Sequence, residues 1–262
     1  MSGTVRLFRI PVAKVTEPEA VERIVALAKQ QAYDNKLPEG GGKRAAFVAT
    51  LNVDFVSNAV RGWPFGGNDE LWGYLQGADL VTADGMPIVL LSKLLRDPLP
   101  ARVTGADMVP AICRRCAEEG LSVYVLGGER EALEEAFAKL PPVKVAGLDP
   151  AFVNLDEEQP EIVARINAAK PDVLFVALGN PKQELWMGRN AAKLDASVMI
   201  GVGGTFNFIA GRVKRAPRWM QRCGLEWVYR VCQEPGRLWR RYAYGLVKFS
   251  WLALRMMTGG YR

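Results

Sequence analysis

The sequence predicts an α/β protein with a mainly parallel, Rossmann-like sheet covered by helices and a basic, aromatic, helical C-terminal appendage. Short apolar runs alternate with helical patterns between residues 45 and 204, and this alternation is typical of a parallel sheet covered on both faces. Residues 211–262 contain 12 Lys and Arg but 2 acidic residues, whereas residues 1–210 contain 22 basic and 26 acidic residues. We therefore expect an α/β core at 1–210 and a basic amphipathic appendage at 211–262.

The elements can be assigned in order along the chain. Residues 5–12 form a predicted strand, and Glu17–Gln31 a helix with apolar residues on one face. A strand at Ala45–Leu51 leads into a helix from Val53, and the Gly, Pro and aromatic residues of Arg61–Asp69 indicate a loop. There follow strand Ala78–Ala83 with helix Pro87–Leu95, strand Ser122–Leu126 with helix Glu129–Leu140, strand Val143–Gly147 with helix Glu157–Ala169, strand Asp172–Leu178 with helix Lys182–Lys193, and strand Ser197–Val202.

Histidine is absent from the sequence. This absence excludes a Ser-His-Asp triad, a His-ligated zinc and an imidazole base, so a catalytic acid or base must be a carboxylate, Lys, Tyr or Cys. The 4 cysteines, without an apolar signal-peptide segment, favour a reducing compartment. Cys113 and Cys116 form a C-x-x-C in a helical pattern, which indicates two thiols on one helix. No apolar run approaches the roughly 18 residues of a membrane span.

Polar residues and glycines follow several of the predicted strands. Ligands of parallel sheets bind outside the carboxyl ends of the strands. This rule gathers Thr50, Asn52, Asp84, Gly127, Gly128, Asn180 and Gly203 at one rim. Glycine turns there would let the backbone approach a nucleotide diphosphate. No turn is a complete G-x-G-x-x-G, and tight turns between helix and strand remain an equal alternative for each pair.

Asp84 is the candidate general base, because a partly enclosed carboxylate is the best proton acceptor available without histidine. Its alternative role is a helix N-cap, which position alone favours slightly. Thr50, Asn52 and Gln183 offer uncharged donors for a phosphate or sugar, with capping and turn formation as the alternatives. The convergence of these side chains with the glycine turns favours a ligand site.

No D-x-D motif or dense acidic cluster is present to hold Mg²⁺ or Mn²⁺ against a diphosphate, and no metal or other cofactor is expected. The charge of a departing nucleoside diphosphate must then be offset by cations, for which arginine is well suited. The C-terminal segment can supply such cations from Arg212, Lys214, Arg215, Arg218, Arg222, Arg230, Arg237, Arg240 and Arg241.

Residues 237–257 can be written as a helix with one basic stripe, formed by Arg237, Arg241, Lys248 and Arg255. Aromatic and aliphatic residues fill most of its remaining circumference, which is typical of a helix in a membrane interface. The alternative is a helix docked on its own core or on another subunit of a homo-oligomer. Nucleic acid is not an expected partner, since no nucleic-acid-binding motif accompanies the charge.

From about Ala45 onward the chain resembles the WecG/TagA/CpsF glycosyltransferases. The resemblance is carried by Thr50-Leu51-Asn52, Ala83-Asp84-Gly85, Gly179-Asn180-Pro181-Lys182-Gln183-Glu184, Gly201-Val202-Gly203-Gly204-Thr205-Phe206-Asn207 and Gly211 to Trp219. It implies an α/β core with an appendage, and transfer of a sugar from a UDP-sugar to an undecaprenyl-diphosphate-linked sugar on the bacterial cytoplasmic membrane. It also implies a metal-independent reaction that inverts the anomeric carbon.

The resemblance also implies roles for individual residues. The family's presumed base falls on Asp84, and its Thr and Asn near the donor phosphates fall on Thr50 and Asn52. Its pocket Arg and Gln fall on Arg102 and Gln183. The appendage arginines of the family fall on Arg230, Arg237 and Arg240. Where many members have Asp near the nucleotide base, this chain has Asn207, whose amide can still donate and accept hydrogen bonds.

We therefore expect an inverting, metal-independent glycosyltransferase of bacterial surface polysaccharide synthesis. Its donor is a UDP-sugar, its acceptor a polyprenyl-diphosphate-linked sugar, and its location the inner face of the plasma membrane, bound peripherally through the appendage. Asp84, Thr50 and Arg237 are the expected catalytic residues. Asn52, Arg102, Gln183, Gly127, Gly128, Gly203, Gly204, Asn207, Arg230 and Arg240 are the expected substrate-binding residues. The alternative is a non-catalytic module that binds a nucleotide sugar or an anionic lipid.

Overall fold

A six-stranded parallel sheet forms the centre of the computed structural model, which describes residues 3–34 and 44–260 except the side chain of Arg237. The strands are β3 (Ala46–Leu51), β4 (Leu80–Ala83), β5 (Ser122–Leu126), β6 (Lys144–Asp149), β7 (Val173–Val176) and β8 (Val198–Gly201). Their order is β4-β3-β8-β7-β5-β6, and every neighbouring pair is parallel. The predicted fold class is confirmed.

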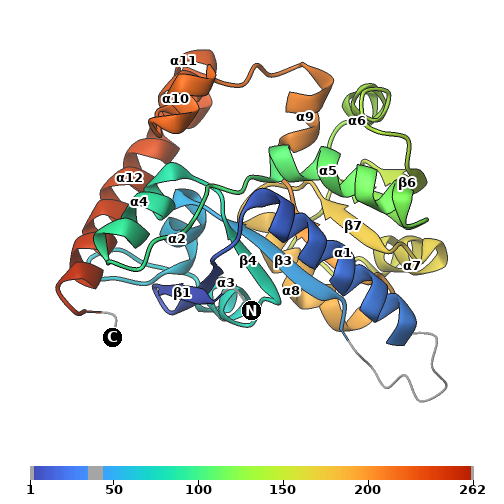
Figure 1. The fold of residues 1–262 in the computed structure, drawn as a ribbon, viewed down its shortest axis with the longest axis horizontal. Helices are drawn as coiled ribbons and strands as arrows, with labels where there is room; N and C mark the ends of the chain where they lie inside the picture. Colours follow the sequence, from blue (N-terminus) through green and yellow to red (C-terminus); the bar gives the residue numbers. More distant parts are fainter. Residues whose placement is uncertain (1–2, 35–43, 261–262) are drawn as a thin grey trace.

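Side chains of the central strands alternate between two buried clusters, one on each face of the sheet. In β3, Ala46 and Val48 belong to one cluster, whereas Phe47, Ala49 and Leu51 belong to the other. The first face is covered by α1 (Glu17–Asp34), α5 (Gly105–Glu118), α6 (Arg130–Phe137) and α9 (Thr205–Ala210). The second is covered by α2 (Val53–Ala59), α3 (Asp69–Gln76), α4 (Met86–Leu94), α7 (Pro160–Ala169) and α8 (Lys182–Asn190). The layers are visible in Figure 1.

The predicted single strand at 5–12 is wrong. The segment is an antiparallel hairpin of β1 (Thr4–Leu7) and β2 (Ile10–Ala13), which turns at Phe8 and Arg9. Both turn residues have positive φ, 53° and 65°, and neither is a Gly, Asn or Asp that would indicate such a turn. The alternation of apolar residues continues through the turn and conceals it.

Other elements differ from the prediction at their ends. The loop at Arg61–Asp69 is followed by an unpredicted helix, α3, whose N-cap is Asn68. The helix predicted from Glu157 begins at Pro160, because proline at the first helical position has no N–H to satisfy. The helix predicted to end at Lys193 becomes a 3₁₀ turn, η1 (Ala191–Lys193).

The appendage is helical, with α10 (Arg218–Arg222), α11 (Glu226–Gln233) and α12 (Pro235–Met257). Figure 1 shows an extended segment leading from α9 to α10 and α11, and α12 running along one side of the molecule. Among the helices of the described residues, none is long and apolar enough to cross a membrane.

Helix α12 packs on α2, and one of its faces is part of the core. Phe249 and Leu252 are buried in the cluster on the second face of the sheet. The Ser57 hydroxyl donates to the carbonyl oxygen of Gly245 at 3.0 Å. Lys248 is 1% exposed and donates to the carbonyl oxygens of Ser57 and Gly66. The predicted basic stripe is therefore wrong at Lys248, because this ammonium anchors the helix to the core.

Candidate functional site

A cavity of about 380 Å³ lies at the carboxyl ends of β3, β4 and β8 and is lined on its other side by the appendage. Its core wall contains Thr50, Asn52, Asp84, Arg102, Gly179, Asn180, Gln183, Gly203 and Gly204. Its appendage wall contains Arg215, Gln221, Glu226, Trp227, Arg230, Leu238, Arg241 and Tyr242. Two segments that are distant in sequence thus share one site.

Asp84 follows the last residue of β4 and lies half-buried in the cavity wall. Its backbone N–H donates to the carbonyl oxygen of Leu51 at 2.8 Å, which fixes the end of β4 against β3. The N-cap of α4 is Gly85 and has no side-chain cap hydrogen bond. The capping alternative for Asp84 is therefore wrong, and its carboxyl group is left to face the cavity.

The environment of Asp84 raises its pKa to about 7. Burial is the main cause, because it disfavours the charged carboxylate. The guanidinium of Arg102 opposes this effect, while the negative charge of Glu226 adds to it. A carboxyl group with a pKa near neutrality can accept a proton from a substrate and release it again.

Thr50 and Asn52 both line the cavity, at the end of β3. The Thr50 hydroxyl is buried and donates to the carbonyl oxygen of Gly201 at 3.3 Å, so it links β3 to β8. Oδ1 of Asn52 accepts from the backbone N–H of Phe55 at 3.2 Å and caps α2. The capping alternative therefore holds for one side of the Asn52 amide, and its Nδ2 group remains for a ligand.

Gln183 is 2% exposed and organises the glycine turns beside it. Its Oε1 atom accepts from the backbone N–H groups of Gly179 and Gly203, at 3.1 and 3.0 Å. Gly203 has a φ of 52° and lines the cavity with Gly204. One amide oxygen thus holds the turns after β7 and β8 together at the rim.

Gly127 and Gly128 do not line the cavity. They follow β5, which is separated from β3 by β7 and β8 in the sheet. A Cβ atom on Gly127 would lie 2.7 Å from a Leu178 methyl group and 3.0 Å from the Ala177 carbonyl oxygen. Close packing against the next strand, at a φ of 88°, explains this glycine.

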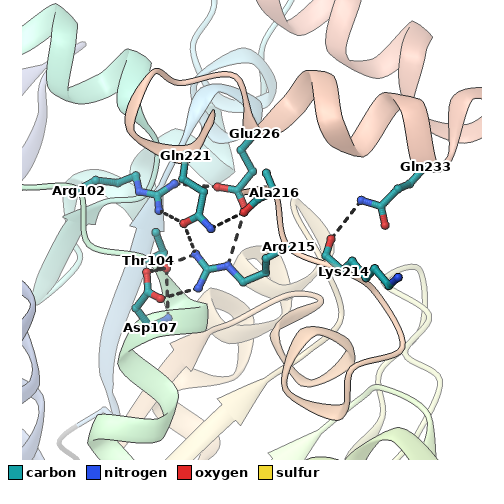
Figure 2. Close-up of polar contacts among 9 residues, drawn as sticks. All are labelled: Arg102, Thr104, Asp107, Lys214, Arg215, Ala216, Gln221, Glu226 and Gln233. Atoms are coloured by element: carbon teal, nitrogen blue, oxygen red, sulfur yellow. Dashed lines mark hydrogen bonds and ion pairs between the residues drawn. The ribbon is translucent and has the colours of Figure 1, made fainter. Parts of the chain in front are cut away.

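Five residues join the core to the appendage over the cavity, and we call them the clasp: Arg102, Asp107, Arg215, Gln221 and Glu226 (Figure 2). Arg102 Nη1 donates to Glu226 Oε2 at 2.8 Å, and its Nη2 donates to Gln221 Oε1 at 2.9 Å. Arg215 Nη1 donates to Asp107 Oδ1 at 2.5 Å, and its Nη2 donates to the same Gln221 oxygen at 3.1 Å. One amide oxygen thus bridges two guanidinium groups from different parts of the chain.

The clasp is electrostatically balanced. Burial alone would raise the pKa of Asp107, but hydrogen bonds from Arg215 and Thr104 outweigh it and lower the pKa. The carboxylate is therefore ionised beside the guanidinium. Arg215 Nε is buried without a hydrogen-bond partner among the described residues and lies 3.9 Å from Glu226 Oε1. Two arginines and two carboxylates alternate, so each charge of the clasp has an opposite charge beside it.

The expected appendage arginines do not all reach the cavity. Arg230 lines it, with its guanidinium 5.4 Å from the centre of the Phe208 ring and its buried Nε without a hydrogen-bond partner among the described residues. Asn207, in α9, also lines the cavity. Arg240 is exposed over the Trp239 ring and does not line it. The side chain of Arg237 lies outside the described part of the chain.

The sequence predicted no role in the site for Gln221 or Glu226, and it predicted Arg215 and Arg241 only as members of the group of C-terminal cations. Arg241, one residue after Arg240, lines the cavity and donates to Asp54 Oδ2 at 2.7 Å. The available signal was Glu226, which is one of only 2 acidic residues in 211–262. A rare carboxylate among so many cations indicates a specific partner.

Within the parts of the chain that the structure describes, no group of three or more Cys, Asp or Glu side chains is arranged to hold a metal ion. Three of the guanidinium groups that line the cavity, those of Arg102, Arg215 and Arg241, form ion pairs with carboxylates. The arrangement offers a proton acceptor at Asp84 and cations on the opposite wall.

Comparison with known proteins identifies the family to which the chain belongs. The model of the glycosyl transferase WecG/TagA/CpsF family matches residues 5–262, which includes the hairpin before the segments that carry the resemblance. An N-acetylglucosaminyldiphosphoundecaprenol N-acetyl-beta-D-mannosaminyltransferase of Bacillus spizizenii is 31% identical over 202 residues, covering 76% of this chain and 75% of the relative. A protein of the same name from Bacillus subtilis is 29% identical over 203 residues, covering 76% and 75%. The chain therefore belongs to the glycosyl transferase WecG/TagA/CpsF family and is a glycosyltransferase.

Proposed function

We propose that the protein transfers a sugar from a UDP-sugar to a lipid-diphosphate-linked sugar, with inversion at the anomeric carbon and without a metal ion. The observation that carries this proposal is Asp84, a carboxyl group with a pKa of about 7 that faces a cavity with arginines on its opposite wall. A base and cations on opposite sides of a substrate are the two elements that a direct displacement requires.

In the proposed reaction, an acceptor hydroxyl oxygen attacks the anomeric carbon and forms the new glycosidic bond. The bond from that carbon to the donor phosphate breaks on the opposite face, which inverts the configuration. Asp84 takes the hydroxyl proton, and the electron pair of the broken bond remains on UDP. Thr50, Asn52 and Gln183 are proposed to bind the donor, because their polar groups converge at the rim.

Arginine is proposed to replace a metal ion at the diphosphate. Arg230 is the strongest candidate, because its buried Nε atom faces no hydrogen-bond partner among the described residues. Arg102 and Arg215 are already bridged by the clasp, so their proposed role is to set the local charge and hold the appendage. Arg237 stays a proposed catalytic residue from the resemblance, and Arg240 a proposed contact for the acceptor.

The acceptor is proposed to carry an undecaprenyl chain, by analogy with the two Bacillus relatives. Helix α12 supports this proposal, because the face turned away from the core exposes Trp239, Val247, Leu254 and Met257. We place this face in the interface of the bacterial plasma membrane, on the inner side. The same face is the proposed contact for a second subunit when no membrane is present.

The test is a transfer assay with the purified protein, a panel of UDP-sugars and a vesicle-borne lipid-diphosphate-N-acetylglucosamine acceptor. We expect one donor to give an elongated lipid-linked glycan and an equal amount of UDP, with little change on addition of EDTA. Complete loss of transfer with EDTA, restored by Mg²⁺, would overturn the metal-free mechanism. Binding of UDP-sugars without transfer to any acceptor would support the alternative, a non-catalytic binding module.

A further inference from the structure

Glu184 is a completely buried carboxyl group near the start of α8, and the proposed reaction leaves it without a role. It lies directly after Gln183, which lines the cavity. No Lys or Arg of the described residues forms an ion pair with it. Burying an unpaired acid costs folding free energy, and an apolar residue of similar size would avoid that cost. Stability therefore does not explain a carboxyl group at this position.

One oxygen of Glu184 fixes the orientation of Asn180. Glu184 Oε2 accepts from Asn180 Nδ2 at 2.8 Å. The other end of that amide, Asn180 Oδ1, accepts from Asn58 Nδ2 at 2.7 Å. Because both ends of the amide have partners, the side chain of Asn180 has one preferred orientation at the cavity.

The second oxygen lies beside Gln183 and has no hydrogen-bond partner among the described residues. A Cβ atom on Gly201 would lie 2.8 Å from Glu184 Oε1 and 2.6 Å from Gln183 Nε2. Both side-chain atoms thus occupy the space that a side chain at position 201 would need. Gln183 Oε1 is already committed to two backbone N–H groups, which leaves Nε2 on the side of the carboxyl group.

We propose that Glu184 is a positioning residue of the donor site: its carboxyl group accepts a hydrogen bond from the Asn180 amide and lies beside the Gln183 amide, and so keeps both amides in the orientation that meets the sugar nucleotide. The proposal rests on the proposed function for the identity of the ligand. Glu184 itself lies outside the cavity wall and acts through the two amides.

The protonation of Glu184 agrees with this role. Burial raises the pKa of its carboxyl group to about 7, although the amides of Gln183 and Asn180 act in the opposite direction. The carboxyl group is therefore not a permanent charge near neutral pH. In its protonated form it can donate as well as accept, whereas an amide at this position would present an NH₂ group to the NH₂ group of Gln183.

The test compares Glu184→Gln and Glu184→Met with a control, Ser122→Ala. Ser122 is also buried and loses a hydrogen bond to Asp172, but it is the first residue of β5 and lies at the amino end of the strand, away from the cavity at the carboxyl ends. Calorimetry with UDP and a transfer assay give the binding constant, KM and kcat. Thermal unfolding at pH 8 gives the stability of each variant.

For both Glu184 variants we expect UDP binding weakened about tenfold and a higher donor KM. Their unfolding temperature should equal or exceed that of the unmodified protein, because a costly buried acid is removed. Ser122→Ala should show the opposite pattern, with lower stability and unchanged binding. Glu184 variants that bind and transfer normally, or that lose binding only in proportion to lost stability, would overturn the proposal.

A measurement without ligand separates this proposal from the proposed function. The side-chain amide resonances of Asn180 and Gln183 in ¹⁵N spectra should shift in Glu184→Gln and remain in place in Ser122→Ala. Unchanged resonances in Glu184→Gln would overturn the positioning role whatever the protein binds. Shifted resonances in a protein that binds no UDP would support the positioning of the amides and contradict the UDP-sugar donor instead.

Discussion

The two walls of the cavity are held in place by different interactions. In the core wall, Thr50 and Gln183 hydrogen-bond to backbone groups of neighbouring strand ends, at distances of 3.0 to 3.3 Å. In the appendage wall, Arg215 and Glu226 are held by side chains of the core, across 108 and 124 residues of sequence. The core wall is thus part of the sheet, whereas Arg215 and Glu226 of the appendage wall are held against the core by charge pairs. Substitutions in the two walls should therefore differ in their effects on turnover and on the coupling between charged residues.

The largest effect is expected in the core wall, from Asp84→Asn. Removing a general base typically lowers the rate about 10²- to 10⁴-fold, so kcat should fall by that order while UDP binding measured by calorimetry changes little. Asp97→Asn is the control, because Asp97 is an exposed carboxylate paired with Lys14. Undiminished turnover in Asp84→Asn would exclude Asp84 as the base.

The appendage wall is tested by a double-mutant cycle on Asp107→Asn and Arg215→Met. Each single substitution leaves a partly buried charge without its partner. We therefore expect kcat/KM to fall about tenfold in each single variant. In the double variant kcat/KM should fall by much less than the two single fold-losses multiplied together. The exposed pair Lys193 and Glu158 serves as the control and should show almost no coupling. Full additivity at positions 107 and 215 would contradict the role of the clasp.

Substitutions on the exposed face of α12 should weaken membrane binding and leave the fold unchanged. Val247→Ser and Leu254→Ser each remove an exposed apolar side chain, 60% exposed in both, and should weaken binding to anionic vesicles about three- to tenfold. Val145→Ser, on β6, is the matched control because it is also exposed. Deletion of the whole appendage is a poorer test, since it would also remove the core residues Phe249 and Leu252.

The smallest expected effect is on stability. The pKa of Asp84 in the folded protein is raised from 3.8 to about 7, so the folded state binds this proton more tightly than the unfolded state does. The contribution of the Asp84 carboxyl group to the free energy of unfolding is therefore most favourable below pH 3.8. This contribution is lost as the pH rises to about 7. Asp84→Asn should raise the unfolding temperature at pH 8 and not at pH 4. An equal shift at both pH values would contradict the raised pKa.

The Asp84 carboxyl group also sets the pH dependence of turnover, which should increase with pH where the contribution of this group to stability decreases. Asp84 must be ionised to accept a proton, so kcat/KM should decrease below about pH 7, where its carboxyl group becomes protonated. A pH profile from 5 to 9 would measure this. A flat profile would mean that another group takes the proton.

The sequence predicted the core wall well, because its residues lie next to regular elements. Asp84 and Thr50 lie at the carboxyl ends of apolar strands, and the rule for parallel sheets places them at one rim. Gly127 followed the same pattern but lies too far along the sheet, because strand order is set by the crossovers and not by the order in the sequence. Sequence periodicity contains no information on that order.

The appendage wall was predicted less well, because its positions depend on tertiary pairing. Lys248 fits a basic stripe by spacing, yet it is buried through its contacts with Ser57 and Gly66. Arg240 and Arg241 are neighbours on one helix, but only Arg241 points to Asp54 and the cavity. A helical spacing defines which residues share a face, while the partner of that face is decided by the rest of the fold.

The most direct test of the proposed reaction is a single-turnover transfer assay that compares the unmodified protein with Asp84→Asn at equal occupancy by a UDP-sugar. A lipid-diphosphate-N-acetylglucosamine acceptor is added, and both elongated glycan and UDP are measured. We predict equal amounts of the two products with the unmodified protein, and a loss of both with Asp84→Asn while the donor remains bound. Equal product formation by the two proteins, or UDP release without an elongated glycan, would contradict the account.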